Sequence, residues 1–397
     1  MVNGQKIVRT LTLRGMLLSG LFWFGYCSYV AFTATMLIDY GWSDSAATGL
    51  ITMMSVVTFL TQPLIGFLSD KQGSVKRQAI WMMLLGSVSL ALLPFALKSG
   101  SRLLTVCAII FCTVTVSQAP GIMDAWIVGL NQEYPALNYG LVRGTGSFAY
   151  AVSSQLMGTL TVAFGTPARL WVGGAACLLG FLAAVSLQDV KPAPKEEQSE
   201  QLTGKAAVKM LFSSKSYRLL LFVAFCLLLG TVSLVTLLQL CIRDFGGSAS
   251  EIGTVSAVCA IIEVPAMFTM AYFIHRFGES KLILFATICY VIRMFLTASA
   301  TSVTALILLQ LLQGVTYAVF VPAAISYLPK CVDPRIRSTA VTFYTAVTGS
   351  VTSIIGNLIT TLFLSAGVQA RWIIAFFGLT SLIGLIGTLI GKKRGIW

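Results

Sequence analysis

Long apolar runs alternate with short polar segments along the whole chain. Each run is about 20 residues, long enough to cross a lipid bilayer as an α-helix. We predict twelve spans, at about 15–37, 46–68, 78–97, 103–129, 141–164, 168–187, 219–242, 251–274, 282–299, 303–328, 339–365 and 372–391. Residues 189–218 form the only long hydrophilic stretch, and their Pro, Glu and Lys content is typical of a flexible linker.

This pattern predicts an all-α integral membrane protein. Six spans precede the hydrophilic stretch and six follow it. We therefore expect two pseudo-symmetric six-helix bundles, residues 1–188 and 219–397, joined by a cytoplasmic linker over 189–218. A signal peptide does not explain the first run, because residues 15–37 are too long for a signal core and more spans follow.

Composition agrees with a membrane protein. The 397 residues are 56% hydrophobic and only 10% charged, whereas a soluble domain carries about 25% charged residues. The nine cysteines are scattered, mostly within apolar runs, and form no C-x-x-C pair. They are typical of small core residues and predict neither a disulfide framework nor a metal site.

The net charge of +13 predicts an orientation. With both termini in the cytoplasm, 20 Lys and Arg residues fall in cytoplasmic segments and five in outer segments. An excess of bases on the cytoplasmic side is the usual bias of membrane proteins. We therefore expect a multi-pass protein of a bacterial inner membrane, with lipid as a neighbour and no nucleic acid as a partner.

A charged turn after the second span has a copy in the second half of the chain. The stretch IGFLSDKQGSVKR at 65–77 aligns with MAYFIHRFGESKL at 270–282. Such duplication is typical of transporters built from two related halves. The first copy holds a set of glycine, acidic and basic positions: Gly66, Asp70, Lys71, Gly73, Lys76 and Arg77.

This turn reads G-x-L-x-D-K-x-G-x-x-K-R and resembles the signature loop of the major facilitator superfamily. With the twelve spans and the linker, the resemblance covers essentially the whole chain. It implies a secondary transporter that works by alternating access, and neither an enzyme nor a cofactor-dependent protein. It also implies that the loop latches the two halves on the cytoplasmic side. The alternative is a basic loop that sets topology without gating.

Four charged residues lie clearly within spans: Asp124, Arg143, Glu263 and Arg293. Each costs at least about 2.5–3.5 kcal/mol at a helix centre. Two acids and two bases suggest pairing in a wet central cavity. Asp124 and Arg143 lie near the cytoplasmic ends of adjacent antiparallel spans, so they can meet and offer donors and acceptors to a hydroxylated solute. A purely structural ion pair is the alternative.

A narrower resemblance adds roles for these residues. The stretches QPLIGFLSDKQG, APGIMDAW and YGLVRGTGSFAYA are similar to the lactose permease branch of oligosaccharide–proton symporters. This resemblance implies that Asp124 and Arg143 hold the solute, and it matches Glu263 and Arg293 to an acid of its eighth span and an arginine of its ninth. The position of Glu263 in the middle of a span suits a proton carrier, so we expect Glu263 and Arg293 to take part in proton coupling. The resemblance also implies that Tyr150 stacks on the solute. Tyr150 shares a helix face with Arg143, and Ser147 lies on the same face; ordinary packing is the alternative for Tyr150.

The chain departs from that branch in its tenth span. Gln313 and Thr316 stand where the branch has a histidine and a glutamate, and Gln310 replaces a lysine. The usual proton site is therefore absent, so Glu263 or Asp124 is expected to carry the proton, and lactose-like specificity is in doubt. Glu263 could instead be paired with Arg293, and both roles could apply at different steps. A proline two residues after Glu263 could break that helix.

These patterns predict proton-coupled import of a small polar solute, such as a glycoside or a nucleoside. No nucleotide-binding motif is present, which disfavours an ATP-driven pump, so the proton gradient is the expected energy source. The transporter is expected to act as a monomer. Two alternatives stay open. An exporter of amphipathic compounds by proton antiport would lower the amount of its compound in cells. A non-transporting membrane sensor would bind a solute without flux.

Overall fold

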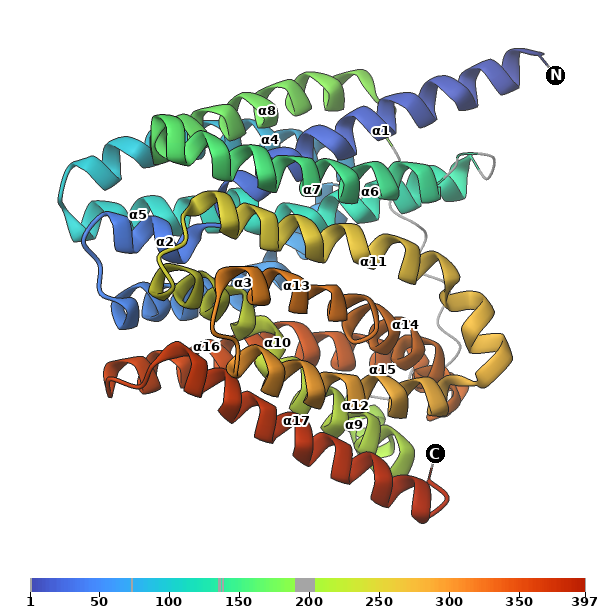
Figure 1. The fold of residues 1–397 in the computed structure, drawn as a ribbon. Coiled ribbons are helices and arrows are strands. Elements are labelled where there is room, and N and C mark those ends of the chain that lie inside the picture. The colour runs from blue at the N-terminus through green and yellow to red at the C-terminus, as the bar shows by residue number, and fades with distance from the viewer. Residues whose placement is uncertain (1, 73, 135–136, 138, 190–203, 397) are drawn as a thin grey trace. The chain divides into compact units, whose positions relative to one another are not determined.

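A computed structural model describes residues 2–72, 74–134, 137, 139–189 and 204–396. Every regular element in these ranges is a helix (Figure 1). Part of the predicted linker lies outside the described residues. Its later part forms α9 (Gly204–Ser213) and the beginning of α10 (Lys215–Asp244).

The helices before the linker follow one another with short connections. They are α1 (Val2–Val30), α2 (Thr33–Asp39), α3 (Asp44–Gln72), α4 (Val75–Lys98), α5 (Arg102–Cys112), the π-helix η1 (Thr113–Ser117), α6 (Ala119–Glu133), α7 (Tyr139–Phe164) and α8 (Thr166–Ser186). Three of these elements, α5, η1 and α6, join into one candidate span from Arg102 to Glu133.

The helices of the second half continue after α9 and α10. Its elements are α11 (Ala249–Phe277), α12 (Glu279–Ala298), α13 (Val303–Leu309), the 3₁₀ helix η2 (Gln310–Gly314), α14 (Tyr317–Tyr327), η3 (Leu328–Lys330), η4 (Pro334–Ile336), α15 (Arg337–Thr345), the π-helix η5 (Ala346–Val351), α16 (Thr352–Ser365) and α17 (Ala370–Lys393).

Ten helices or helix runs among the described residues are long and apolar enough to cross a membrane. A bent pair, α1 and α2, makes an eleventh if it counts as one span, with a bend of 43°. The remaining predicted span, 141–164, lies in α7, which is 26 residues long. The all-helical membrane fold is confirmed, and the number twelve stays a prediction.

The chain forms two compact units. Unit 1 consists of Met1–Ser43, Met53–Pro194 and Gly247–Ile261. Unit 2 consists of Asp44–Thr52, Lys195–Gly246 and Ile262–Trp397. The first turns of α3 thus pack with unit 2, and the first turns of α11 pack with unit 1. The predicted bundle limits at 188 and 219 stay a prediction.

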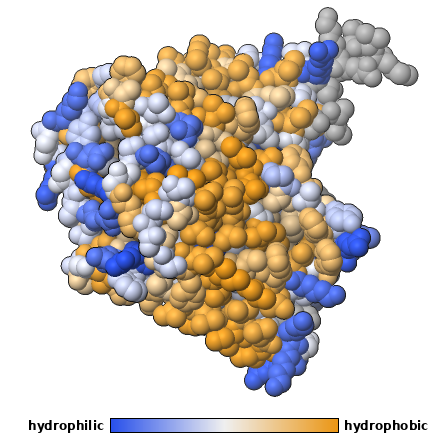
Figure 2. Space-filling view, in the orientation of Figure 1, coloured by the Kyte–Doolittle hydropathy of each residue, from blue (hydrophilic) through white to orange (hydrophobic). Residues whose placement is uncertain are grey.

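Apolar side chains face outward as well as inward. Trp126 is fully buried in the core of unit 1, and Phe320 is fully buried in that of unit 2. In contrast, Phe148 and Phe164 are 68% and 73% exposed. Figure 2 shows apolar side chains over the middle of the visible face and hydrophilic side chains at its left and right margins. Apolar exposure on this scale fits a surface that contacts lipid.

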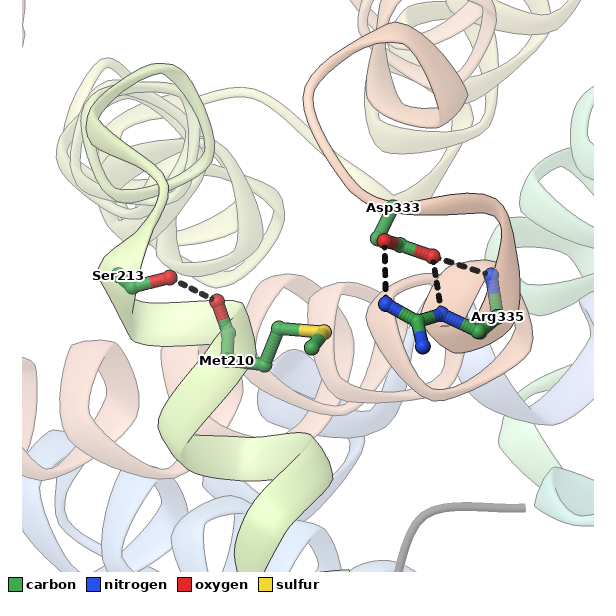
Figure 3. A network of polar contacts seen from close by, with 4 residues as sticks. All are labelled: Met210, Ser213, Asp333 and Arg335. Atoms are coloured by element: carbon green, nitrogen blue, oxygen red, sulfur yellow. Dashed lines mark hydrogen bonds and ion pairs between the residues drawn. The ribbon is translucent and has the colours of Figure 1, made fainter. Parts of the chain in front are cut away.

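A serine cap at the start of α10 also binds the loop around Cys331 within unit 2. Ser214 caps α10 by accepting from the Tyr217 amide, and its hydroxyl donates to the Cys331 carbonyl at 2.6 Å. In the loop that follows, Asp333 accepts from Nε and Nη2 of Arg335, each at 3.0 Å (Figure 3). The Asp333 carboxylate also caps η4 through the Arg335 amide at 2.9 Å. This short loop is therefore held by charge and by capping together.

Replacing Asp333 with asparagine is expected to lower stability slightly at neutral pH and to have no effect in strong acid. The hydrogen bonds from Arg335 hold the pKa of the Asp333 carboxyl at about 2, below its ordinary value of about 3.9. A depressed pKa in the folded state stabilises the protein above the ordinary pKa, and this contribution is lost as the pH falls through the lower value. The difference between the two proteins should therefore persist down to about pH 4 and vanish toward about pH 2.

Thermal unfolding of both proteins across this pH range measures the effect. Because the Arg335 side chain is largely exposed, added salt should also shrink the difference. A difference that stayed constant into strong acid would show that Asp333 acts through something other than its charge.

Candidate functional site

Asp124 of α6 and Arg143 of α7 come together in unit 1. Arg143 Nε lies 3.8 Å from Asp124 Oδ1, and the two side chains are 38% and 40% exposed. A charge-assisted hydrogen bond is about 2.7–2.9 Å long, so this pair is loose. Arg143 Nη1 also donates to Ser147 Oγ, one turn along α7, at 3.4 Å. The structure thus places these three predicted residues side by side; their role stays a prediction.

Trp23 of α1 forms an aromatic wall beside this pair. Arg143 Cζ lies 4.8 Å from the centroid of the Trp23 ring, which is within the range of a cation–π interaction. Tyr150 and Tyr26 meet the Trp23 ring edge-on, with centroids 6.3 and 5.2 Å away. Gly146 of α7 makes room for the indole, because a Cβ there would overlap it. The predicted Tyr150 therefore belongs to an aromatic group centred on Trp23.

This arrangement combines two kinds of binding surface. The guanidinium of Arg143 offers N–H donors, and the Asp124 carboxylate offers acceptors. Both are open enough to be reached from outside the protein. The rings of Trp23 and Tyr150 offer apolar faces. A polar solute with an apolar ring face could bind to all of these groups at once.

Arg293 of α12 is buried in unit 2 and is held by neutral acceptors from one neighbouring span. Its side chain is 2% exposed. Nη2 donates to Gln310 Oε1 at 2.7 Å, and Nη1 donates to Thr316 Oγ1 at 3.1 Å. Nη1 also donates to Gln313 Oε1. The three residues that depart from the permease pattern are thus the residues that bind this guanidinium.

Glu263 of α11 joins the same cluster through Gln313. Gln313 Nε2 donates to Glu263 Oε1 at 2.7 Å, so one amide connects the carboxylate to the Arg293 guanidinium. The helix break that a proline after Glu263 could cause is not present in this described segment, because α11 continues through Pro265 to Phe277. A single proline can be accommodated within a membrane helix when neighbouring groups satisfy the freed carbonyl.

The span that carries the acceptors changes its helical form at this point. Residues Gln310–Gly314 form the 3₁₀ helix η2 between α13 and α14. Because a 3₁₀ helix has about three residues per turn, side chains three apart lie on one face. Gln310 and Gln313 therefore lie on the same side, toward Arg293. A stretch of 3₁₀ helix within a longer helix often marks a hinge.

The predicted gating loop is described only in part. Lys76 Nζ donates to the carbonyls of Val185 and Leu187 at 2.9 and 2.5 Å, which ties α4 to the end of α8 inside unit 1. Arg77 is exposed. Gly73 lies outside the described residues. For Gly66, Asp70 and Lys71 only the helical backbone is described. A latch between the two halves stays a prediction.

Arg169 of α8 is a buried cation that the sequence places among the outer bases. It is 1% exposed, and its Cζ lies 4.6 Å from the centroid of the Phe32 ring. Within the described residues, its Nε and Nη1 have no hydrogen-bond partner. Phe32 lies at the bend between α1 and α2. A count of charges by segment cannot reveal such burial, because Arg169 is only three residues from the start of its helix.

Comparison with known proteins gives a consistent family. The model of the MFS_1 like family matches residues 15–375. The maltose permease of Geobacillus stearothermophilus is 26% identical, over 89% of this chain and 87% of its own. The raffinose permease of Escherichia coli is 24% identical, over 81% and 79%. A probable 3-phenylpropionic acid transporter of Escherichia coli is 25% identical, over 77% and 79%.

Solved structures agree on the fold. The crystal structure of the nucleoside transporter NupG superposes with a TM-score of 0.78 at 16% identity, covering 96% of this chain and 99% of that chain. The helical membrane fold, the charged residues inside spans and the family match over most of the chain lead to one conclusion. The chain belongs to the MFS_1 like family, and it is a multi-pass secondary transporter of small solutes and not an enzyme.

Proposed function

We propose that this chain imports a small polar solute together with a proton. The solute binds at Asp124 and Arg143 in unit 1, beside Trp23, Ser147 and Tyr150. Glu263 in unit 2 carries the proton, with Arg293 as its partner. The protein acts as a monomer in a bacterial inner membrane, with both termini in the cytoplasm, and the proton gradient supplies the energy.

The looseness of the Asp124–Arg143 pair carries this proposal. A pair that served only to join two helices would gain most from close contact and full burial, yet these side chains are 3.8 Å apart and more than a third exposed. Exposed ion pairs contribute about 0–1 kcal/mol, whereas placing each charge in a span costs about 2.5–3.5 kcal/mol. Stability therefore does not account for the pair, and solute binding does.

The solute class follows from the same residues and from the relatives. Arg143 and Asp124 offer donors and acceptors to hydroxyl groups, and the face of Trp23 can cover the apolar side of a ring. Two of the relatives reported above are permeases of maltose and raffinose. A glycoside is thus the first candidate, and a nucleoside the second. The tenth span lacks the charged groups of the lactose permease branch, so the solute need not be lactose.

The proton site follows from the carboxylates inside spans. Glu263 is hydrogen-bonded within a cluster that also contains a buried guanidinium, so a change in its charge alters the electrostatic balance of the cluster. Asp124 is the other acid inside a span, and it already faces Arg143. We therefore assign proton transfer to Glu263 and solute binding to Asp124.

The external pH of a lightly buffered, de-energised suspension of cells expressing the chain tests this function. Maltose, raffinose, uridine and 3-phenylpropionate are added in turn. Proton symport predicts that one of them makes the medium more alkaline. Arg143→Ala should abolish that change, and Arg143→Lys should weaken it at least about tenfold, because lysine lacks the planar fork of donors.

Arg371→Ala is the matched control. Arg371 also lies over a tryptophan ring, with its Cζ 5.2 Å from the Trp372 centroid, but it is exposed and outside both clusters. Its alkalinisation should equal that of the unmodified protein. Normal alkalinisation by Arg143→Ala would refute the assigned solute site, and a pH change of the opposite sign would favour export by antiport.

A further inference from the structure

Gln313 has neighbours of opposite charge at the two ends of its amide. Its Oε1 accepts from Arg293, and its Nε2 donates to Glu263 at 2.7 Å. A guanidinium can only donate, and an ionised carboxylate can only accept. The two neighbours therefore fix the orientation of the amide as long as Glu263 is ionised. Hydrogen bonds in such a chain polarise one another and become stronger together.

We propose that Gln313 is a positioning residue that couples the protonation of Glu263 to the hydrogen bonding of Arg293. This inference rests on the proposed role of Glu263 as the proton carrier. Protonation removes the negative charge that aligns the bridge, and it adds an O–H that needs an acceptor of its own. Gln313 Oε1 belongs to the side chain that already contacts Glu263. When the amide turns to accept this O–H, its carbonyl leaves Arg293.

Arg293 stays in place during this step because two other acceptors are independent of Glu263. Gln310 Oε1 and Thr316 Oγ1 continue to accept from the guanidinium. The change is therefore the loss of one hydrogen-bond acceptor from Nη1. On deprotonation, Gln313 accepts from Nη1 again. Gln313 thus converts the protonation of Glu263 into the loss of one hydrogen bond to Arg293.

The backbone around Gln313 is suited to pass a movement of this side chain on to α11. Gln313 lies in η2, whose 3₁₀ form is less regular than the flanking α-helices. The next residue, Gly314, packs closely on α11, since a Cβ there would lie 2.9 Å from Ile262 Cγ1. Ile262 precedes Glu263 directly. A rearrangement of the Gln313 side chain therefore occurs at the contact between η2 and α11, where the backbone of η2 is less regular.

The other titratable groups around the cluster do not compete in the same pH range. Arg293 and Tyr290 lie on α12, and Tyr317 and Tyr344 lie near Tyr290 on α14 and α15. A phenol ordinarily titrates near pH 10 and a guanidinium higher still. On α11 itself, His275 and Arg276 lie in the last turn, about 18 Å further along the helix. Glu263 is thus the carboxylate of this cluster, and the proposed proton transfer is assigned to it.

Infrared difference spectroscopy on the purified full chain, without any solute, tests the coupling. The protein carries isotope-labelled arginine, and spectra are recorded between about pH 5 and pH 9. The carboxyl band that disappears in Glu263→Gln reports protonation of Glu263. The guanidinium band that disappears in Arg293→Lys reports the hydrogen bonding of Arg293. In the unmodified protein, we expect the two bands to change together.

Gln313→Met keeps the size of the side chain and removes its hydrogen bonds. We expect the Glu263 band to titrate still and the accompanying guanidinium change to be lost. Gln313→Asn, one methylene too short to bridge, should give the same loss and serves if the first variant folds poorly. Gln118→Met removes a buried glutamine from unit 1, and it should leave the coupled change intact.

The outcomes separate the two proposals. A guanidinium change that survives in Gln313→Met and Gln313→Asn overturns the coupling role of Gln313, while Glu263 remains a proton carrier. If the Glu263 band does not titrate in the unmodified protein, both the coupling and the proposed proton site fail. The coupling is established if the guanidinium change is lost in the Gln313 variants and kept in Gln118→Met.

Discussion

Arg293→Leu is expected to abolish transport and to lower the free energy of unfolding by about 2–4 kcal/mol, because two amide acceptors lose their buried donor. Gln310 Oε1 and Gln313 Oε1 both accept from Arg293, whose side chain is 2% exposed. The substitution also leaves Glu263 without the cation that the cluster provides. Thermal unfolding in detergent, together with uptake of the solute identified by the pH assay, measures both effects.

A combined variant separates stability from function. Replacing Gln310 and Gln313 with leucine in the Arg293→Leu background removes the unsatisfied acceptors, so stability should largely return. Transport should remain absent, because the charged partner of Glu263 is still missing. Arg371→Leu is the control for loss of an exposed arginine, and it should change stability little. An Arg293→Leu protein with unchanged unfolding and normal uptake would contradict this account of the cluster.

Gly253→Val is expected to give the second large effect, by separating α11 from α7 within unit 1. A Cβ at Gly253 would overlap the carbonyl oxygen of Ser154 and lie 3.0 Å from its carbonyl carbon. The contact is reciprocal, because a Cβ at Gly158 of α7 would overlap the carbonyl oxygen of Ala249. Backbone atoms cannot move aside as a flexible side chain can. Small residues at such crossings allow two membrane helices to approach closely.

Overpacking of this kind typically costs about 1–3 kcal/mol. It should also reduce transport at least about tenfold, because α7 carries Arg143 of the proposed solute site and small misplacements of binding groups are costly. Gly144→Val is the matched control, since a Cβ at Gly144 of the same helix meets nothing within 4 Å. Uptake and thermal unfolding are compared for the two variants. Equal behaviour of both would show that the close crossing is not needed for transport.

Much of the fold and one half of the site are predictable from sequence. Apolar length gives the helices, since a run of about 20 residues can span the bilayer only as a helix or be buried as one. The meeting of Asp124 and Arg143 follows from their depth in adjacent antiparallel spans. Trp23 gives no such signal, because it stands among several aromatic residues of the first span and its side chain direction depends on how α1 packs on α7.

The arrangement around Arg293 could not be predicted for a different reason. In a regular α-helix, residues six apart are rotated by about 120° relative to one another, so Gln310 and Thr316 would face different sides. The 3₁₀ turn in η2 changes that relation. From the sequence alone, the two glutamines indicate only the loss of a proton site. In the structure, they and Thr316 accept hydrogen bonds from one buried cation.

Under the proposed proton symport, the use of neutral amides around Arg293 limits the concentration ratio of solute that this transporter can build. Only two carboxylates lie clearly within the predicted spans, and the Asp124 carboxylate is assigned to solute binding. In the proposed mechanism, one proton per cycle then enters through Glu263. At a driving force of about 150 mV, one proton supplies about 3.5 kcal/mol, which corresponds to a concentration ratio of about 10²–10³ for an uncharged solute. Such a carrier suits a cell that scavenges a solute present outside at micromolar rather than nanomolar levels.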